Sequence, residues 1–286
     1  MKLAIYTKGG DYFSLLDLEN LLNLANKYSL SLSFNDEFAT FANNHYAFEL
    51  NSYNDCSDID ADYMVSFGGD GTFLHAVATM GVSEIPIIGV NSGRLGFLAN
   101  VDKADFEVAL KAIITGEFTI DKRAMIEVGG DFEDDNVYPY LFNEFTIQKS
   151  ELNMVDISLD INNHRVLNIA ADGMIVSTPS GSTAYSLSSG GAILSPDCHA
   201  FIITAIAPHN LTIRPIVVDE SSNITMRVKS RVDYCYATLD NRAYKIKSGA
   251  TFIIKLSPHK VSLVKLHGNS FFETLRKKLL WGKENR

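Results

Sequence analysis

Asp70 is the residue whose surroundings in the sequence most clearly suggest chemistry. It lies in the segment VSFGGDGTF, where the apolar residues 63–67 give way to glycines and then to a helical pattern. A carboxylate at the start of a helix can take a proton from a hydroxyl group, and the free amides there suit a phosphate. Ligands of open α/β sheets bind beyond the carboxyl ends of the strands, which favours a ligand site. The alternative is a helix N-cap, in which Asp70 satisfies helical amides without catalysis.

A second glycine-lined turn, GRLGF at residues 93–97, follows the next apolar run at residues 85–90. It is expected at the same edge of the sheet as Asp70, although ordinary turn glycines would give the same pattern. The two common nucleotide fingerprints, GxxxxGK[ST] and GxGxxG after the first strand, do not occur in the sequence. A phosphate site here would therefore be of another type.

Residues 171–191 form a second concentration of polar groups, rich in Ser, Thr and Gly. Small and hydroxyl-bearing residues let backbone and side chains approach a polar ligand closely. A flexible linker has a similar composition. Apolar residues such as Ile175, Tyr185 and Leu187 interrupt the segment, so we favour a packed binding loop.

Asn143 and Glu144 follow directly on the apolar residues 138–142. Asn offers a donor and an acceptor and Glu accepts from hydroxyls, which would suit a base edge and a ribose, although such a pair is also common on any surface. Arg214, in a proline-bounded segment with His209, would contact phosphate or have a structural role. The seven histidines show no metal-ligand spacing, so we predict no metal held by the protein.

The elements that must position these residues change in style near the middle of the chain. Up to about residue 115, apolar runs alternate with helical patterns, as in a parallel open sheet, with strands predicted at 2–6, 63–67 and 85–90 and helices at 11–28, 71–80 and 105–115. From residue 118 the pattern is strand after strand, including 154–161, 224–228, 251–256 and 261–266. An amphipathic helix returns at residue 271.

The predicted fold class is α/β plus all-β. A Rossmann-like α/β domain is expected at residues 1–117, with the helix of residues 268–286 packing back on it, and an antiparallel β-sandwich-like domain at residues 118–267.

Composition narrows the function classes. The 286 residues are 46% hydrophobic and 21% charged, as in an ordinary globular protein long enough for two domains. The net charge of −9 makes nucleic acid an unlikely partner. The three cysteines are far apart, and the sequence has neither a secretory leader nor an apolar stretch long enough to span a membrane, so we expect a cytoplasmic protein without a membrane partner.

Together these segments resemble the NAD kinase family, in its bacterial form. The match consists of GGDGT at 68–72, GRLGFL at 93–98, NE at 143–144, DGMIVSTPSGSTAYSLSSGG at 172–191 and PHNLTIRP at 208–215. GGDGT alone is shared with diacylglycerol and sphingosine kinases and, approximately, with phosphofructokinases. The long block at 172–191 is what makes the resemblance specific.

The resemblance implies the NAD kinase fold and a Mg²⁺-dependent transfer of the γ-phosphoryl of ATP to the 2′-hydroxyl of the adenosine ribose of NAD. It implies that Asp70 is the catalytic base. Phosphate is expected to bind at Gly68, Gly69, Gly71, Thr72 and His75, although His75 would equally fit an ordinary residue on the face of the helix.

The resemblance also assigns residues to the binding of NAD, and family members are usually homodimers or homotetramers, which we expect here. The expected NAD-binding residues are Asp70, Gly71, Asn143, Glu144, Asp172, Thr183, Ala184, Tyr185, Ser188 and Asp240.

The sequence departs from the family pattern at two positions. Ala170 stands where many relatives have Arg. Arg242, two residues after Asp240, stands where relatives commonly have a residue with a side-chain amide. Two rival functions stay open: a lipid or sphingoid kinase, which would need an apolar pocket for acyl chains, and a non-catalytic NAD-sensing protein.

Overall fold

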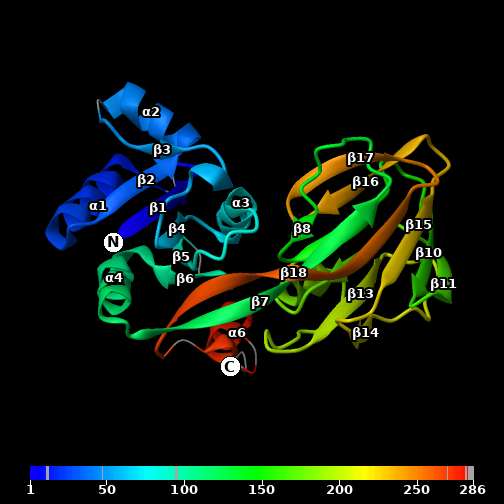
Figure 1. Ribbon diagram of the computed structural model, residues 1–286. Helices are drawn as coiled ribbons and strands as arrows, with labels where there is room; N and C mark the ends of the chain where they lie inside the picture. The colour runs from blue at the N-terminus through cyan, green and yellow to red at the C-terminus, as the bar shows by residue number, and fades with distance from the viewer. Residues whose placement is uncertain (11–12, 47, 94–95, 269, 281, 283–286) are drawn as a thin grey trace. The chain divides into compact units, whose positions relative to one another are not determined.

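The computed structural model divides the chain into two compact units (Figure 1). Unit 1 comprises Met1–Lys122 and Val261–Arg286, and unit 2 comprises Arg123–Lys260. The structure describes residues 1–286 except 11–12, 47, 94–95, 269, 281 and 283–286. The predicted class, α/β followed by antiparallel β with a returning C-terminal helix, is confirmed.

Unit 1 is built on a parallel sheet with the strand order β3-β2-β1-β4-β5. The end of β18 pairs with β5 through Leu263 and Ile87, and β6 also pairs with β5. The strands are β1 (Lys2–Thr7), β2 (Ser31–Asn35), β3 (Ser52–Tyr53), β4 (Tyr63–Phe67), β5 (Ile87–Asn91) and β6 (Ala99–Asp102).

Five helices accompany this sheet in the described part of unit 1: α1 (Leu15–Tyr28), α2 (Asp36–Tyr46), α3 (Asp70–Met80), α4 (Phe106–Thr115) and α6 (Phe271–Leu279). The start of α1 is fixed by a capping box, in which Ser14 and Asp17 bond to each other's backbone amides. Its buried residues Leu18 and Leu21 join a core cluster with α2, α4 and the sheet.

Unit 2 contains antiparallel strands in two sheets. One sheet has the order β14-β13-β12-β9-β16-β17, and the other runs β11-β10-β15-β18, with β7 and β8 attached. The strands are β7 (Phe118–Gly130), β8 (Tyr140–Leu141), β9 (Glu144–Gln148), β10 (Val155–Ile161), β11 (His164–Ala171), β12 (Gly173–Ser177), β13 (Ala200–Ile206), β14 (Ile216–Asp219), β15 (Ile224–Lys229), β16 (Tyr234–Leu239), β17 (Arg242–Lys247) and β18 (Thr251–Leu266).

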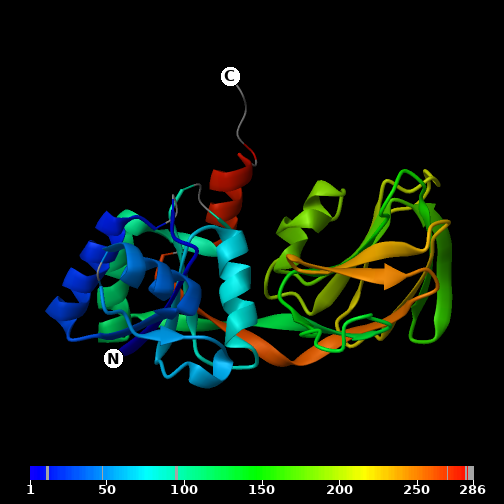
Figure 2. The ribbon, with the colours of Figure 1, turned by 90° about the horizontal axis from the view of Figure 1, so that it is seen from above.

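The core of unit 2 is formed by apolar residues of both sheets, such as Ile147, Phe201 and Phe252, which are fully buried. Side chains of two facing sheets that interdigitate in this way form a sandwich. A short helical segment, consisting of a single turn at Gly181–Thr183 and α5 (Tyr185–Ser188), lies on one side of the strands and is yellow-green in Figure 2.

Three local predictions need correction. The two strands predicted at residues 251–256 and 261–266 form one continuous strand, β18. The proline at 258 does not interrupt it, because the φ of proline is compatible with an extended chain. The strand β2 and the helix α2 were not predicted. The helix expected at 11–28 begins at Leu15, and residues 11 and 12 lie outside the described residues.

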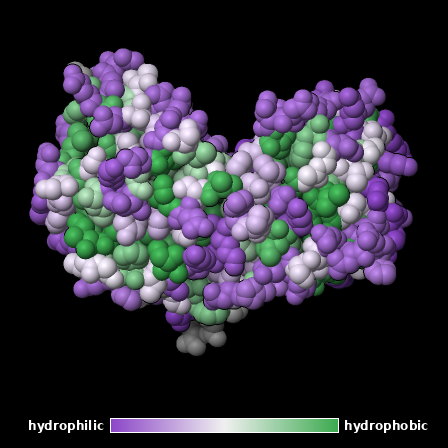
Figure 3. Space-filling model, in the orientation of Figure 1, coloured by the Kyte–Doolittle hydropathy of each residue, from purple (hydrophilic) through white to green (hydrophobic). Residues whose placement is uncertain are grey.

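Hydrophilic and apolar side chains are intermingled on the face of the molecule shown in Figure 3. In the part of the chain that the structure describes, no helix combines the length and the hydropathy needed to cross a membrane.

Candidate active site

The turn from β4 into α3 depends on Gly68. Its φ of +154° is rarely adopted by residues with a side chain, and a Cβ at this position would collide with the side chain of Thr72. The chain therefore turns sharply at the carboxyl end of β4, and α3 begins with Gly69 as its N-cap and Asp70 as its first residue.

The carboxylate of Asp70 is held by backbone amides from a different part of unit 1. Oδ2 accepts a hydrogen bond from the amide of Phe97 (3.0 Å), and Oδ1 accepts from the amides of Leu98 (3.0 Å) and Ala99 (3.1 Å). No side-chain hydrogen bond caps α3 among the described residues. The N-cap interpretation of Asp70 is therefore wrong, because its carboxylate points to the turn before β6.

Gly96 allows this arrangement. A Cβ at Gly96 would collide with Oδ1 of Asp70 and would lie 2.8 Å from its Cγ. The second glycine-lined turn predicted from the sequence is thus a cradle for the carboxylate. Arg94 and Leu95, which belong to the same motif, lie outside the described residues.

Lys278, on α6, also reaches Asp70. Its Nζ lies 3.2 Å from Oδ2, and the two side chains are 30% and 31% exposed. The same ammonium group lies 4.4 Å from the centre of the Phe97 ring. Sequence reasoning missed Lys278, although this residue lies within the amphipathic helix predicted from residue 271.

The residues expected to bind phosphate surround the start of α3. The amide of Gly68 donates to the carbonyl of Val90 (2.9 Å), so this amide is not available to a phosphate, which corrects one predicted contact. Among the described residues, no atom lies within 4 Å of where a Cβ would be at Gly69 or Gly71, and Thr72 is buried. His75 lies half-buried further along α3.

In unit 2 the structure brings Asn143, Glu144 and Asp240 together. Asp240 is in the left-handed conformation (φ +52°) at the turn between β16 and β17. Its carboxylate accepts hydrogen bonds from the amides of Phe142 (2.8 Å), Asn143 (2.7 Å) and Glu144 (3.0 Å). Asp240 therefore fixes the backbone from which the other two side chains project.

Glu144 is buried, with only 7% of its surface exposed. Burial raises the pKa of Glu144 to about 8, and the negative charge of Asp240 adds to the effect. Burial also raises the pKa of Asp240, which the three amides and Arg242 oppose. A carboxyl that keeps its proton near neutral pH can donate a hydrogen bond as well as accept one.

Two side-chain atoms of this cluster have no hydrogen-bond partner among the described residues: Oε2 of Glu144 and Oδ1 of Asn143. Buried polar atoms without a partner are costly and rare in folded proteins. At the amino end of β9 they therefore mark a place where a polar ligand is expected to supply the missing hydrogen bonds.

The hydroxyl-rich segment packs against this cluster. The amide of Thr178 donates to the carbonyl of Asn143 (2.9 Å), and its hydroxyl donates to the carbonyl of Phe142 (2.7 Å). Ser177 and Ser182 are also completely buried. The linker alternative is thus wrong, and the segment is a packed turn.

Four of the expected NAD-binding residues, namely Thr183, Ala184, Tyr185 and Ser188, lie together on the short helical segment. Thr183 and Ala184 are half-buried, Ser188 is exposed, and Tyr185 is 38% exposed. The hydroxyl of Thr183 donates to the carbonyl of Ser180 (3.2 Å). Tyr185 therefore offers an accessible ring on which a flat base could stack.

Asp172 is not part of the Glu144 cluster within this chain. Asp172 lies just before the start of β12, whereas Glu144 pairs with Ser177 at the other end of that strand. Its carboxylate forms an ion pair with Lys149 (2.6 Å).

Arg242 and Arg214 have structural roles. Arg242 donates to the carbonyls of Tyr138 and Tyr140, both at 2.8 Å, and its guanidinium lies over the Tyr138 ring. It thereby fixes the chain just before Asn143, which the sequence did not reveal. Arg214 donates to the carbonyls of Leu211 and Ile213 in its own turn.

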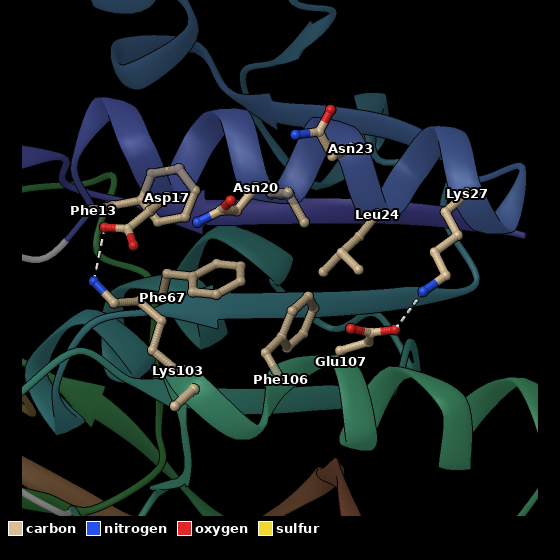
Figure 4. A pocket seen from close by; sticks show the side chains of 12 residues that line it. Phe13, Asp17, Asn20, Asn23, Leu24, Lys27, Phe67, Lys103, Phe106 and Glu107 are labelled. Atoms are coloured by element: carbon tan, nitrogen blue, oxygen red, sulfur yellow. Dashed lines mark hydrogen bonds and ion pairs between the residues drawn. The ribbon is translucent and has the colours of Figure 1, made fainter.

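A pocket of about 520 Å³ lies between α1 and α4 of unit 1 (Figure 4), and no residue predicted to bind substrate lines it. Ion pairs between Asp17 and Lys103 (2.7 Å) and between Lys27 and Glu107 (2.9 Å) flank it. Phe67 on its wall is buried against neighbouring aromatic rings. We interpret it as a groove between two helices.

Within the described residues, no three His, Cys, Asp or Glu side chains are grouped so that they could hold a metal ion.

Comparison with known families agrees with this geometry. Residues 19–118 match the ATP-NAD kinase N-terminal domain, and residues 142–266 match the ATP-NAD kinase C-terminal domain. A NAD kinase of Porphyromonas gingivalis is 42% identical over 77% of this chain and 76% of its own length. One of Bacteroides fragilis is 34% identical over the whole of both chains. The chain belongs to the NAD kinase family.

Solved structures share the fold. Yeast NADH kinase complexed with NADH superposes with a TM-score of 0.91 at 21% identity, covering 100% of this chain and 89% of the yeast chain. A NAD kinase from Archaeoglobus fulgidus in complex with ATP superposes with a TM-score of 0.76 at 21% identity, covering 98% and 97%.

Proposed function

We propose that the chain transfers the γ-phosphoryl group of ATP to the 2′-hydroxyl of the adenosine ribose of NAD, giving NADP and ADP. As a member of the NAD kinase family it is an enzyme, and its relatives of 32–42% identity include NAD kinases from several bacteria. The observation that carries the mechanism is the carboxylate of Asp70, held at the start of α3 by three amides.

Asp70 has the properties of a general base. Backbone amides fix its position, and its side chain is still 31% exposed to an approaching substrate. In the proposed reaction Asp70 orients the 2′-hydroxyl and takes its proton while the oxygen attacks the γ-phosphorus. Phosphoryl transfer depends mainly on such positioning and on charge neutralisation.

The start of α3 is the proposed phosphate site. The amides of Gly69, Gly71 and Thr72 belong to the first turn of a helix, whose positive end attracts anions. His75 is proposed to contact phosphate from the same helix. Mg²⁺ is proposed to arrive on the phosphates of ATP, as part of the substrate, where it would neutralise their charge.

Unit 2 is proposed to bind the adenosine of NAD. The unpartnered atoms of Asn143 and Glu144 suit the hydroxyl and amine groups of a nucleoside. Tyr185 would stack on the base, and Thr183 and Ser188 would add hydroxyls at its edge. Asp240 is proposed to act by holding the backbone of this cluster.

We further propose a cytoplasmic homodimer or homotetramer. The three cysteines are all free, as is usual in a reducing compartment. Asp172, which lies apart from the Glu144 cluster, is proposed to reach nucleotide bound to a second copy. Exposed apolar residues of unit 2, such as Leu152 (95%) and Leu211 (84%), are consistent with contacts between copies.

The test is an assay of purified protein with NAD, ATP and Mg²⁺, coupled to an NADP-specific dehydrogenase. Formation of NADP is the expected result. Phosphorylation of a lipid or sphingoid base without NADP would establish the first rival function. Tight NAD binding with no product would establish the second.

A further inference from the structure

The carboxylate of Asp70 meets four hydrogen-bond donors. Oδ1 accepts from the amides of Leu98 and Ala99, and Oδ2 accepts from the amide of Phe97 and from Nζ of Lys278. An ionised carboxylate has about four acceptor positions, so these donors fill it. A substrate hydroxyl can donate to Asp70 only after one of them leaves.

Lys278 is the donor that is able to leave. The other three are backbone amides at the turn into β6, whose position is fixed by the pairing of β6 with β5. Lys278 is a flexible side chain on a four-carbon stem, and 30% of this side chain is exposed to solvent.

The helix α6 keeps Lys278 beside Asp70 whether or not its ammonium group is bonded to Oδ2. Leu275, one turn before Lys278, is buried (2% exposed), and the ring of Phe271 lies 6.4 Å from that of Phe97. The ammonium group lies over the same Phe97 ring. Only the end of the lysine side chain therefore has to move when the hydroxyl arrives, while α6 stays in place.

We propose that Lys278 is a residue of the active site whose hydrogen bond to Asp70 is replaced by one from the substrate. In the free enzyme its ammonium group occupies the place on Oδ2 that the 2′-hydroxyl of NAD takes on binding. The displaced ammonium group then faces the phosphoryl group being transferred. The inference rests on the proposed function, in which Asp70 is the base for this hydroxyl.

The chemistry at this point needs a mobile cation. As the ribose oxygen bonds to the γ-phosphorus, the bond from phosphorus to the bridging oxygen breaks and its electron pair leaves with ADP, while the hydroxyl proton passes to Asp70. Charge on the transferred group is stabilised by a nearby cation. In the free enzyme the same cation offsets the charge of Asp70, which would otherwise repel incoming ATP.

The decisive variant is Lys278→Met, which keeps an apolar stem over Phe97 and removes the charge. We expect kcat to fall by about 10²-fold, the scale of losing one donor to the transition state. The Kd of NAD, measured by titration calorimetry without ATP, is expected to stay the same or fall, because the hydroxyl no longer competes with the ammonium group. Lys278→Arg is expected to recover part of kcat.

Lys277→Met is the matched control, because Lys277 is on the same helix, is 63% exposed and pairs with Glu273 instead (3.2 Å). It is expected to leave kcat and the Kd of NAD at wild-type values. Thermal melting checks that each variant is folded, and Lys278→Gln replaces the Met variant if the latter unfolds, with the same expected result.

The inference is overturned if the folded Lys278 variant keeps wild-type kcat, or if its loss of rate is matched by weaker NAD binding. If Lys278→Met keeps the wild-type kcat while Asp70→Asn is inactive, the proposed function stands and only the role inferred for Lys278 is rejected. If Asp70→Asn turns over like wild type, Asp70 is not the base and both the assignment and this inference are wrong.

Discussion

The two carboxylates at the centre of the proposed reaction, Asp70 in unit 1 and Glu144 in unit 2, are built in opposite ways. Asp70 is partly exposed and meets four donors. Glu144 is buried, and its Oε2 meets none among the described residues. The donors hold Asp70 in place where it is still accessible, whereas burial favours the protonated form of Glu144. One site thus suits a base, and the other suits a group that recognises hydroxyls.

The largest effect is expected from removing the charge of the exposed carboxylate. In Asp70→Asn, kcat is expected to fall by about 10²-fold or more, the scale of losing a general base, while the Kd of NAD stays within a few-fold. The coupled NADP assay and calorimetry measure the two quantities. Wild-type turnover would reduce Asp70 to a structural residue and remove the contrast with Glu144.

The cradle of Asp70 is tested by adding one methyl group. In Gly96→Ala the new Cβ would collide with Oδ1, so the carboxylate must leave its amides, and kcat is expected to fall by about 10-fold or more. Gly93→Ala is the control, because a Cβ there meets no atom of the described residues within 4 Å. Equal rates in both variants would show that the amides do not position the base.

The buried carboxylate is tested through the pH dependence of stability. The pKa of Glu144 is about 8 in the folded chain against an ordinary value of 4.5. The folded chain therefore keeps a proton that the unfolded chain releases, and the free energy of unfolding falls as pH rises from about 4.5 to 8. The loss approaches about 1.4 kcal/mol per pH unit.

Glu144→Gln removes this contribution, so its free energy of unfolding, measured with urea, is expected to decline less over the same pH range. Below pH 4.5 the two proteins should show similar stability, since Glu144 is then protonated in both states. Parallel curves for wild type and variant would mean that Glu144 does not keep its proton in the folded chain.

The smallest effect is expected at the surface of unit 2. Tyr185→Ala should raise the KM of NAD about fivefold, equivalent to about 1 kcal/mol of lost stacking, and leave the melting temperature unchanged. Tyr236→Ala is the control, because Tyr236 is also 38% exposed but lies on β16. An unchanged KM in Tyr185→Ala would exclude Tyr185 from the pocket.

The sequence predicted the architecture well because hydrophobic periodicity determines strands and helices directly. Tyr63–Phe67 and the start of α6 at Phe271 agree with the predicted bounds. The helix α2 escaped prediction because its buried residues Phe38, Ala39 and Ala42 are few, and two asparagines weaken its pattern.

The site was predictable as a set of motifs but not as a set of contacts. The GGDGT motif located Asp70, yet its partners at residues 97–99 and Lys278 are brought in by tertiary packing from 27 or more residues away. Arg242 was noted only as a departure from the family pattern, and its hydrogen bonds to Tyr138 and Tyr140 depend on a hairpin that no local pattern specifies.

The order of the chain has a consequence for how the enzyme is made. Unit 1 is completed by residues 261–279, which follow all of unit 2 in the sequence. On the ribosome, β5 can pair with β4 and β6 early, but Ile87 at its start lacks its partner Leu263 until the entire β sandwich has been synthesised and β18 arrives. Asp70 is thus translated long before Lys278, and the ion pair between the two can form only after unit 2 has been translated.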